Sequence, residues 1–218
     1  MYDYNTMDRS YGSKLDFNKF AMDKGVKESY IKNYSTQIVN SDGTIMDIYS
    51  KMLNERIIFL TSEVDNYTSN MIKSQLLYLN TVSDDDISIY IDSPGGSVYT
   101  GLGILDVMDF VECDVQTVNI GLAASMAAVI LAYGKDGKRK TLKRSRTMIH
   151  QPLGYSGYAQ ASDIEIDAKQ IMSVKEELLQ VLADSTNQTY EKIKEDSDRD
   201  YWMNGKQAKS YGIVDIIL

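Results

Sequence analysis

Gly121-Leu122-Ala123-Ala124-Ser125-Met126-Ala127-Ala128 is the stretch that decides how this chain folds. A strand-like run, Val115 to Ile120, precedes it, and small and apolar residues continue from Ala123 to Ala132. A strand that passes through a glycine into a helix places Ser125 at or near the helix start. The first helix amides have no intrahelical partner, so they can stabilise negative charge that develops beside Ser125. The same serine could instead be a packing residue or a helix cap.

Alternating strand and helix patterns extend outward from this stretch. Each strand-like run is followed by a segment whose apolar residues have helical spacing. Three such units follow one another, so their strands should lie parallel in one sheet, joined by right-handed crossovers. The sequence therefore predicts an α/β fold. The expected pairs are Arg56–Thr61 with Asn66–Leu79, Ile87–Ile91 with Val98–Val111, and Val115–Ile120 with Ala123–Tyr133.

The spacing of apolar residues also predicts which side of the first helix is buried. Four residues are expected to face the neighbouring strand: Met71, Leu76, Leu77 and Leu79. Beyond the three units, Arg146–His150 is expected to form a short strand, and Ile213–Leu218 a closing one.

Between these last two strands, an extended strip and a long helix lie outside the repeating units. The strip is Gly154–Gln160, and the helix should run from about Ser162 to about Asp184. Ser162 is the expected N-cap because Glu165 follows it three residues later. One side of the helix is apolar through Ile164, Ile171, Val174, Leu178 and Val181. Such elements are suited to docking against another copy of the chain, although the helix could also pack on its own domain.

The first 45 residues differ from the rest of the chain. They are polar and rich in tyrosine, lack sustained periodicity and contain a turn signal at Ser41-Asp42-Gly43. We expect an N-terminal arm over residues 1–45 and a single domain over residues 46–218. The arm could be a mobile loop, a segment ordered only in an assembly or a piece removed on maturation.

Composition and charge limit the possible partners. The 218 residues are 43% hydrophobic and 25% charged, as in soluble globular proteins, and the formal net charge is −8. An acidic chain is a poor ligand for nucleic acid, since phosphate binding depends on Lys and Arg. The basic residues between Lys135 and Arg146 are expected to be solvated or paired with acidic side chains.

Rare residues and apolar runs restrict cofactors and location. Cys113 is the only cysteine and His150 the only histidine, so one chain cannot assemble a disulfide or a Cys/His metal site. We expect no metal and a cytoplasmic location. No secretory signal is evident at the N-terminus, and every apolar run is far shorter than the roughly 20 residues that cross a bilayer. No membrane partner is expected.

A serine hydrolase needs a nucleophile, a base, a carboxylate that orients the base, and amides for the oxyanion. His150, at the end of a predicted strand, is the one available imidazole, and Asp200 is a candidate orienter, although it lies in a charged run typical of a solvated surface. The Gly95-Gly96 turn lets backbone amides approach a substrate, or it is simply a tight connection. Ser97 is a rival nucleophile without a second base.

Several segments together resemble the Clp protease proteolytic subunit family, in order along the chain from about Met46 to Leu218. The resemblance is carried by Asp92-Ser93-Pro94-Gly95-Gly96-Ser97-Val98, Gly121-Leu122-Ala123-Ala124-Ser125-Met126, Met148-Ile149-His150-Gln151-Pro152-Leu153-Gly154, Ala161-Ser162-Asp163-Ile164-Glu165-Ile166 and the stretch Asp196 to Trp202.

That resemblance implies a catalytic group of Ser125, His150 and Asp200, with the backbone amides of Gly96 and Met126 as the oxyanion hole. It implies an α/β fold related to that of crotonases. It also implies two stacked heptameric rings, joined by the strip and the long helix, with Asp198 and Arg199 in contact with a neighbour and the N-terminal residues lining axial pores.

In this family an AAA+ unfoldase threads unfolded proteins into the enclosed rings, and short peptides are cleaved unaided. The resemblance therefore implies an unfoldase partner and no cofactor of the chain's own. The sequence agrees, since it contains no Gly-x-x-x-x-Gly-Lys-Ser/Thr loop for ATP. Tyr90 matches one aromatic position of the unfoldase-docking pocket, but Ser88 replaces another, and Asp92 stands where the family usually has asparagine.

Two other functions are compatible with parts of the pattern. A non-cleaving ring subunit is disfavoured by the presence of Ser125, His150 and Asp200, and fluorophosphonate labelling separates it from a peptidase. A crotonase-like acyl-CoA hydratase or isomerase has a similar oxyanion hole but usually relies on carboxylates, and an acyl-CoA turnover assay separates it.

Overall fold

A computed structural model describes residues 36–40, 43–154 and 160–218. The chain divides into two compact units, residues 1–51 and 52–218, each described by itself. Most of the predicted arm, and residues 155–159 of the predicted strip, lie outside the described residues.

The first unit contains a small antiparallel hairpin. Strand β1, Gln37–Val39, pairs with β2, Ile45–Asp47, and helix α3, Ile48–Asn54, begins directly after it. The Asp47 carboxylate accepts hydrogen bonds from the amides of Tyr49 and Ser50, which caps this helix. The sequence predicts no strand over residues 37–39, because three residues are too few to show a period.

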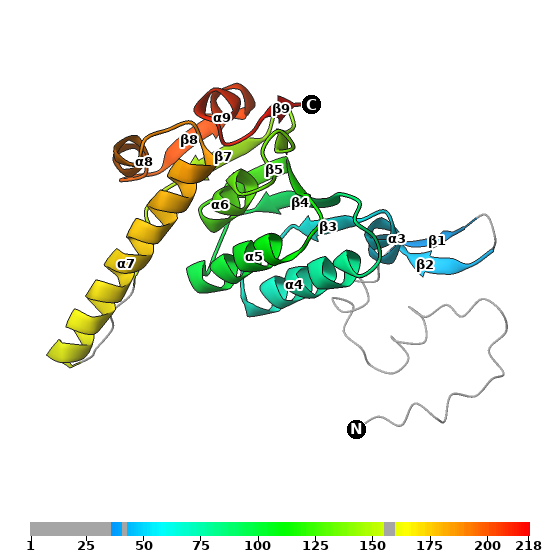
Figure 1. The fold of residues 1–218 in the computed structure, drawn as a ribbon, viewed down its shortest axis with the longest axis horizontal. Helices are drawn as coiled ribbons and strands as arrows, with labels where there is room; N and C mark the ends of the chain where they lie inside the picture. The colour runs from blue at the N-terminus through cyan, green and yellow to red at the C-terminus, as the bar shows by residue number, and fades with distance from the viewer. Residues whose placement is uncertain (1–35, 41–42, 155–159) are drawn as a thin grey trace, which may run out of the picture. The chain divides into compact units, whose positions relative to one another are not determined.

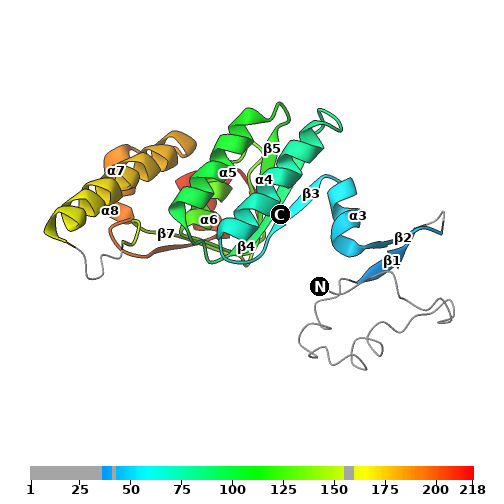
Figure 2. The same ribbon diagram turned by 90° about the horizontal axis from the view of Figure 1, so that it is seen from below.

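Parallel strands form the centre of the second unit, as the sequence predicts (Figure 1). The order is β3, Ile57–Leu60; β4, Ile87–Ser93; and β5, Val115–Ala124. Each is followed by a helix: α4, Asn66–Asn80; α5, Val98–Phe110; and α6, Met126–Ala132. Helices α4 and α5 lie side by side along the sheet (Figures 1 and 2). The second, fourth and sixth residues of β4 are only partly buried or exposed, whereas the other four are buried, so the helices cover one face of this strand.

The predicted burial is wrong for two side chains of α4. Leu76 and Leu79 are buried as expected, but Met71 and Leu77 are 44% and 42% exposed. The buried side instead includes Ile72, which stands four residues before Leu76 and seven before Leu79. That spacing keeps the three side chains on one helix face, whereas Met71 and Leu77 are turned away by about 100° per residue.

Strand β5 is longer than predicted, so helix α6 starts later. Gly121 does not end the strand, because its last three residues pair in parallel with β7, Arg146–Ile149. The Asp92 carboxylate accepts the Leu122 amide at 2.8 Å where the pairing of β4 with β5 shifts register. Ala123 and Ala124 therefore belong to the strand, and the helix begins at Met126.

The C-terminal elements complete the unit. Strand β8, Tyr201–Asn204, pairs antiparallel with β7, while β6, Lys140–Thr141, pairs with both β5 and β9, Ile216–Ile217. Helices α8, Tyr190–Asp196, and α9, Gly205–Tyr211, flank β8 in the chain. The predicted strand over Ile213–Leu218 is thus much shorter in the structure.

The long helix α7 covers Ala161–Ser185, close to the predicted range. Its N-cap is Gln160, not Ser162, because the backbone is already helical at Ala161. Residues 161–170 are all exposed, including Ile164, and the buried side consists of Val174, Leu178, Leu179 and Leu182. Among the described residues, the helix therefore packs on its own unit mainly through its second half, next to α6 and α8 (Figure 2).

Three of the basic residues after α6, Lys135, Lys138 and Arg139, are paired with acidic side chains, as one of the two expectations stated. Lys138 contacts Asp86 at 2.7 Å and Asp114 at 2.9 Å. The buried Arg139 guanidinium contacts Asp215 at 2.6 Å. These basic side chains are therefore engaged within the chain.

Candidate active site

Ser125 occupies the sharp turn between β5 and α6. Its backbone has φ 55° and ψ −128°, a combination that residues other than glycine rarely adopt. The turn is held by a hydrogen bond of 2.8 Å from the Ser125 amide to the Met148 carbonyl on β7. A strained turn of this kind places the hydroxyl beyond the strand end, as in the nucleophile elbow of other hydrolases.

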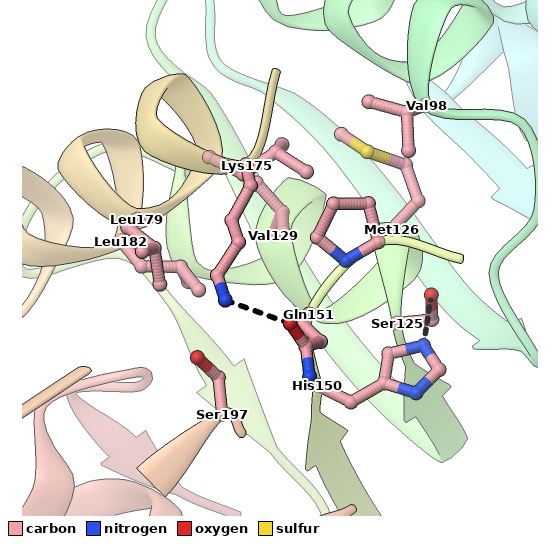
Figure 3. A pocket seen from close by; sticks show the side chains of 12 residues that line it. Val98, Ser125, Met126, Val129, His150, Gln151, Lys175, Leu179, Leu182 and Ser197 are labelled. Carbon is pink, nitrogen blue, oxygen red and sulfur yellow. Dashed lines mark hydrogen bonds between the residues drawn. The ribbon is translucent and has the colours of Figure 1, made fainter. Parts of the chain in front are cut away.

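The structure brings Ser125, His150 and Asp200 together, although they are distant in sequence. His150 follows the last residue of β7, and its Nε2 lies 2.9 Å from Ser125 Oγ (Figure 3). Its Nδ1 lies 3.1 Å from Asp200 Oδ1, just before β8. An ionised carboxylate can only accept, so Nδ1 carries the proton and Nε2 is free to accept from the serine. A serine hydrolase requires these contacts, from the serine to the histidine and from the histidine to the carboxylate.

The side chains of His150 and Asp200 differ in their contact with solvent. The His150 side chain is 17% exposed and the Asp200 side chain 60%. The imidazole is therefore largely enclosed, whereas the carboxylate that orients it is open to water. Solvent screening weakens the electrostatic effect of an exposed carboxylate.

The Gly95-Gly96 turn lies directly against the serine. A Cβ on Gly95 would be 2.5 Å from the Ala124 carbonyl oxygen, 2.7 Å from Ser125 Cβ and 2.9 Å from the Met126 nitrogen. The Gly95 amide donates to Ser93 Oγ at 3.1 Å and is therefore occupied. Gly96 forms a parallel bridge with Val64, and Met126 is the first residue of α6. The turn thus brings glycine backbone next to the first amide of that helix.

Ser97 does not share the histidine. It also lines the groove beside the site and is the N-cap residue of α5. Both ring nitrogens of His150 are already engaged, by Ser125 and by Asp200. Ser97 is therefore left without the base that the rival assignment required.

A groove of about 470 Å³ runs past Ser125 and His150. Its walls come from the turn before α5, the segment after β7 and the middle of α7. Apolar side chains dominate the lining: Pro94, Val98, Tyr99, Met148, Pro152, Leu153, Ile171 and Val174. An extended chain with apolar side chains fits such a surface.

The remaining predicted site residues lie elsewhere. Asp198 belongs to the turn before β8, where its carbonyl accepts a hydrogen bond from Gln151 Nε2 at 2.9 Å. Arg199, in the same turn, is exposed. Tyr90 lies on β4 with its ring centroid 5.8 Å from that of Phe59. Tyr90 is not one of the residues that line the groove.

Sequence reasoning did not single out Gln151 or Lys175. Gln151 stands next to His150 in the quoted motif, and Lys175 lies on α7 at a position flanked by buried Val174. Lys175 Nζ donates to Gln151 Oε1 at 2.7 Å (Figure 3). A lysine next to the apolar side of a helix was the only available signal.

Two kinds of feature are absent from the described part of the chain. Within it, no helix is both long and apolar enough to cross a membrane. Among the same residues, no group of three or more His, Cys, Asp or Glu side chains is placed to hold a metal ion.

A parallel α/β sheet with a strained serine turn, an adjoining histidine and a carboxylate defines the class of serine hydrolases. Comparison with known proteins gives the family: the Clp protease model matches residues 40–218, and the chain belongs to that family. The ATP-dependent Clp protease proteolytic subunit of Bacteroides thetaiotaomicron is 48% identical over 214 residues, covering 96% of this chain and 97% of that protein. The proteolytic subunit of Porphyromonas gingivalis is 47% identical over 194 residues, 88% of this chain and 87% of that protein. Proteolytic subunit 1 of Prochlorococcus marinus is 53% identical over 175 residues, 80% of this chain and 89% of that protein.

Proposed function

We propose that this chain is a serine endopeptidase that forms the proteolytic core of an ATP-dependent Clp protease. The observation that carries the proposal is the continuous contact from Ser125 Oγ through His150 to Asp200, at 2.9 Å and 3.1 Å. Family membership and the names of the relatives support the same activity. The apolar groove beside the serine supports an unfolded polypeptide as the substrate.

The contacts support a two-step acyl transfer. Ser125 Oγ attacks the peptide carbonyl while His150 Nε2 takes its proton, and the same nitrogen then gives that proton to the departing amine. A water molecule subsequently attacks the acyl-enzyme by the same route, which releases the second product and restores the serine. Asp200 accepts the Nδ1–H bond throughout, so the imidazole keeps the tautomer that the reaction needs.

The oxyanion is stabilised by the amides of Gly96 and Met126. The Met126 amide opens helix α6 and therefore has no partner within that helix. The Gly95 amide is engaged by Ser93, which leaves Gly96 as the glycine amide for this role. Two such donors, fixed before the reaction begins, require no reorganisation when the charge develops.

The assembly is two stacked heptameric rings of the crotonase-related fold, in the cytoplasm, and acts in protein quality control. Residues 46–218 form the peptidase domain, and residues 1–45 are an arm that serves as an axial loop or as a prosegment. The exposed first half of α7 is the contact between rings, together with Asp198 and Arg199. Enclosed sites exclude folded proteins, so an AAA+ unfoldase docks near Tyr90, uses ATP and threads unfolded chains inward. The chain needs no cofactor, and nucleic acids and membranes are not its partners.

Peptide hydrolysis by matched serine variants tests the proposal. Ser125→Ala should lower kcat for a short fluorogenic peptide by several orders of magnitude, on the scale of about 10⁶. Ser97→Ala removes a hydroxyl from the same groove and should retain most of the activity. Equal activity of Ser125→Ala and the unaltered chain would contradict the proposal.

A further inference from the structure

Gln151 connects the two segments that carry the base and its orienter. It follows His150 in the chain, and its backbone N–H donates to the Ser197 carbonyl at 2.7 Å. Its side-chain Nε2 donates to the Asp198 carbonyl at 2.9 Å. Both acceptors lie two or three residues before Asp200. One residue therefore fixes the distance between the end of β7 and the turn that presents the carboxylate.

Lys175 determines which way the Gln151 amide faces. An ammonium group can only donate, so the atom 2.7 Å from Lys175 Nζ must be the amide oxygen. The NH₂ group is then directed to the Asp198 carbonyl, which can only accept. Without the lysine, the amide could rotate by half a turn and place oxygen against oxygen. The orientation of Gln151 therefore depends on α7.

The surroundings favour a direct effect of this contact on the site. Gln151, Lys175, Ser125 and His150 line one small pocket of about 20 Å³ between α7 and the serine turn (Figure 3). The hydroxyl of Ser197, itself 1% exposed, faces the same pocket. The Lys175–Gln151 hydrogen bond is partly buried, so it should be stronger than a surface bond and its loss more costly, whereas the Gln151–Asp198 bond is exposed.

We propose that Gln151 is a positioning residue for the His150–Asp200 contact and that Lys175 on α7 sets its orientation. The inference rests on the proposed peptidase function. A displacement of the second half of α7 would withdraw the ammonium, release the Gln151 amide and loosen the turn before Asp200. Peptidase activity would then fall although Ser125, His150 and Asp200 are all present.

Four single variants of the full-length protein test this, assayed for kcat and KM on a short fluorogenic peptide. Gln151→Glu keeps an acceptor for Lys175 but removes the donor to Asp198, so kcat should fall by about 10- to 100-fold with KM nearly unchanged. Lys175→Met should lower kcat by about tenfold. Lys175→Arg, which still donates a hydrogen bond, should keep kcat close to that of the unaltered protein. The matched control is Lys135→Met, since Lys135 lies in the turn after α6, is half exposed and pairs with Asp114 at 2.9 Å, away from the residues that line the site.

A double variant distinguishes positioning from a loss of stability. In an Asp200→Asn background the orienting carboxylate is already gone, so Gln151→Glu should lower kcat by less than about twofold more. A kcat within twofold of the unaltered protein for both Gln151→Glu and Lys175→Met would overturn the inference. So would an equal loss in Lys135→Met, or a full additional loss in the Asp200→Asn background. The proposed function is tested separately, by whether activity requires Ser125.

Discussion

A single methyl group at Gly95 should disable the serine turn. Gly95 has φ +89°, and its added Cβ would lie 2.7 Å from Ser125 Cβ and 2.5 Å from the Ala124 carbonyl oxygen. Ordinary contact begins near 3.4 Å, so Ser125 Cβ would have to move by about 0.7 Å. A displacement of about 1 Å at a reacting group can cost about 100-fold in rate, so Gly95→Ala should lower kcat/KM by about 10- to 100-fold.

Gly137→Ala provides the matched control for this variant. Gly137 has a similar φ of +79°, but nothing lies within 4 Å of its added Cβ. The positive φ alone should cost each variant about 1–2 kcal/mol of stability, and Gly95→Ala should lose more because its Cβ also overlaps neighbouring backbone atoms. Urea unfolding measures that loss, and peptide hydrolysis measures kcat/KM. If the two variants have equal kcat/KM values, contact with Ser125 is not the cause of the lowered kcat/KM in Gly95→Ala, and backbone strain alone is sufficient.

Three further predictions concern charged groups. Asp200→Asn should lower kcat by about 10²- to 10³-fold in steady-state kinetics. This loss is smaller than the ~10⁴-fold loss seen when such a carboxylate is buried, because Asp200 is 60% exposed. An unchanged kcat would exclude Asp200 as the orienter. Peptide hydrolysis should decline on acidification, since a protonated His150 cannot accept the serine proton; a rate that acidification leaves unchanged would count against that base. Burial raises the pKa of Asp215, but the hydrogen bonds from Arg139 lower it by more, so the pKa lies below its ordinary value of 3.8. The ion pair therefore stabilises the fold at neutral pH. Asp215→Asn should therefore lose about 3 kcal/mol at pH 7, with the difference from the unaltered chain shrinking as the pH falls below 3.8, measured by urea unfolding.

Local patterns were sufficient to predict the central part of the fold. The alternation at Ile87, Ile89 and Ile91 predicts a strand buried on one face, and that strand lies next to β5 in the structure. The end of β5 could not be predicted, because its last residues owe their strand conformation to pairing with β7, more than 20 residues later. Likewise, Ser162 has the residue type of an N-cap, yet the backbone enters the helix earlier, after Gln160.

The candidate site could be predicted by residue type but not by geometry. His150 is the sole imidazole in the sequence, and Asp200 was a candidate orienter in a charged run until the resemblance of the motifs to a family implied its role. The φ of 55° at Ser125 has no signal in sequence, since serine ordinarily avoids that conformation. The link from Lys175 through Gln151 to Asp198 depends on how α7 packs, which a one-dimensional pattern does not contain.

The central claim is that Ser125 is a nucleophile activated by His150. Reaction with a fluorophosphonate followed by peptide mass spectrometry tests it directly, because this reagent modifies serines whose hydroxyl is activated by a neighbouring base. The account predicts one adduct per chain, located on Ser125, and its loss in His150→Ala. An adduct on Ser97, or equal labelling of Ser125 with and without the imidazole, would contradict it.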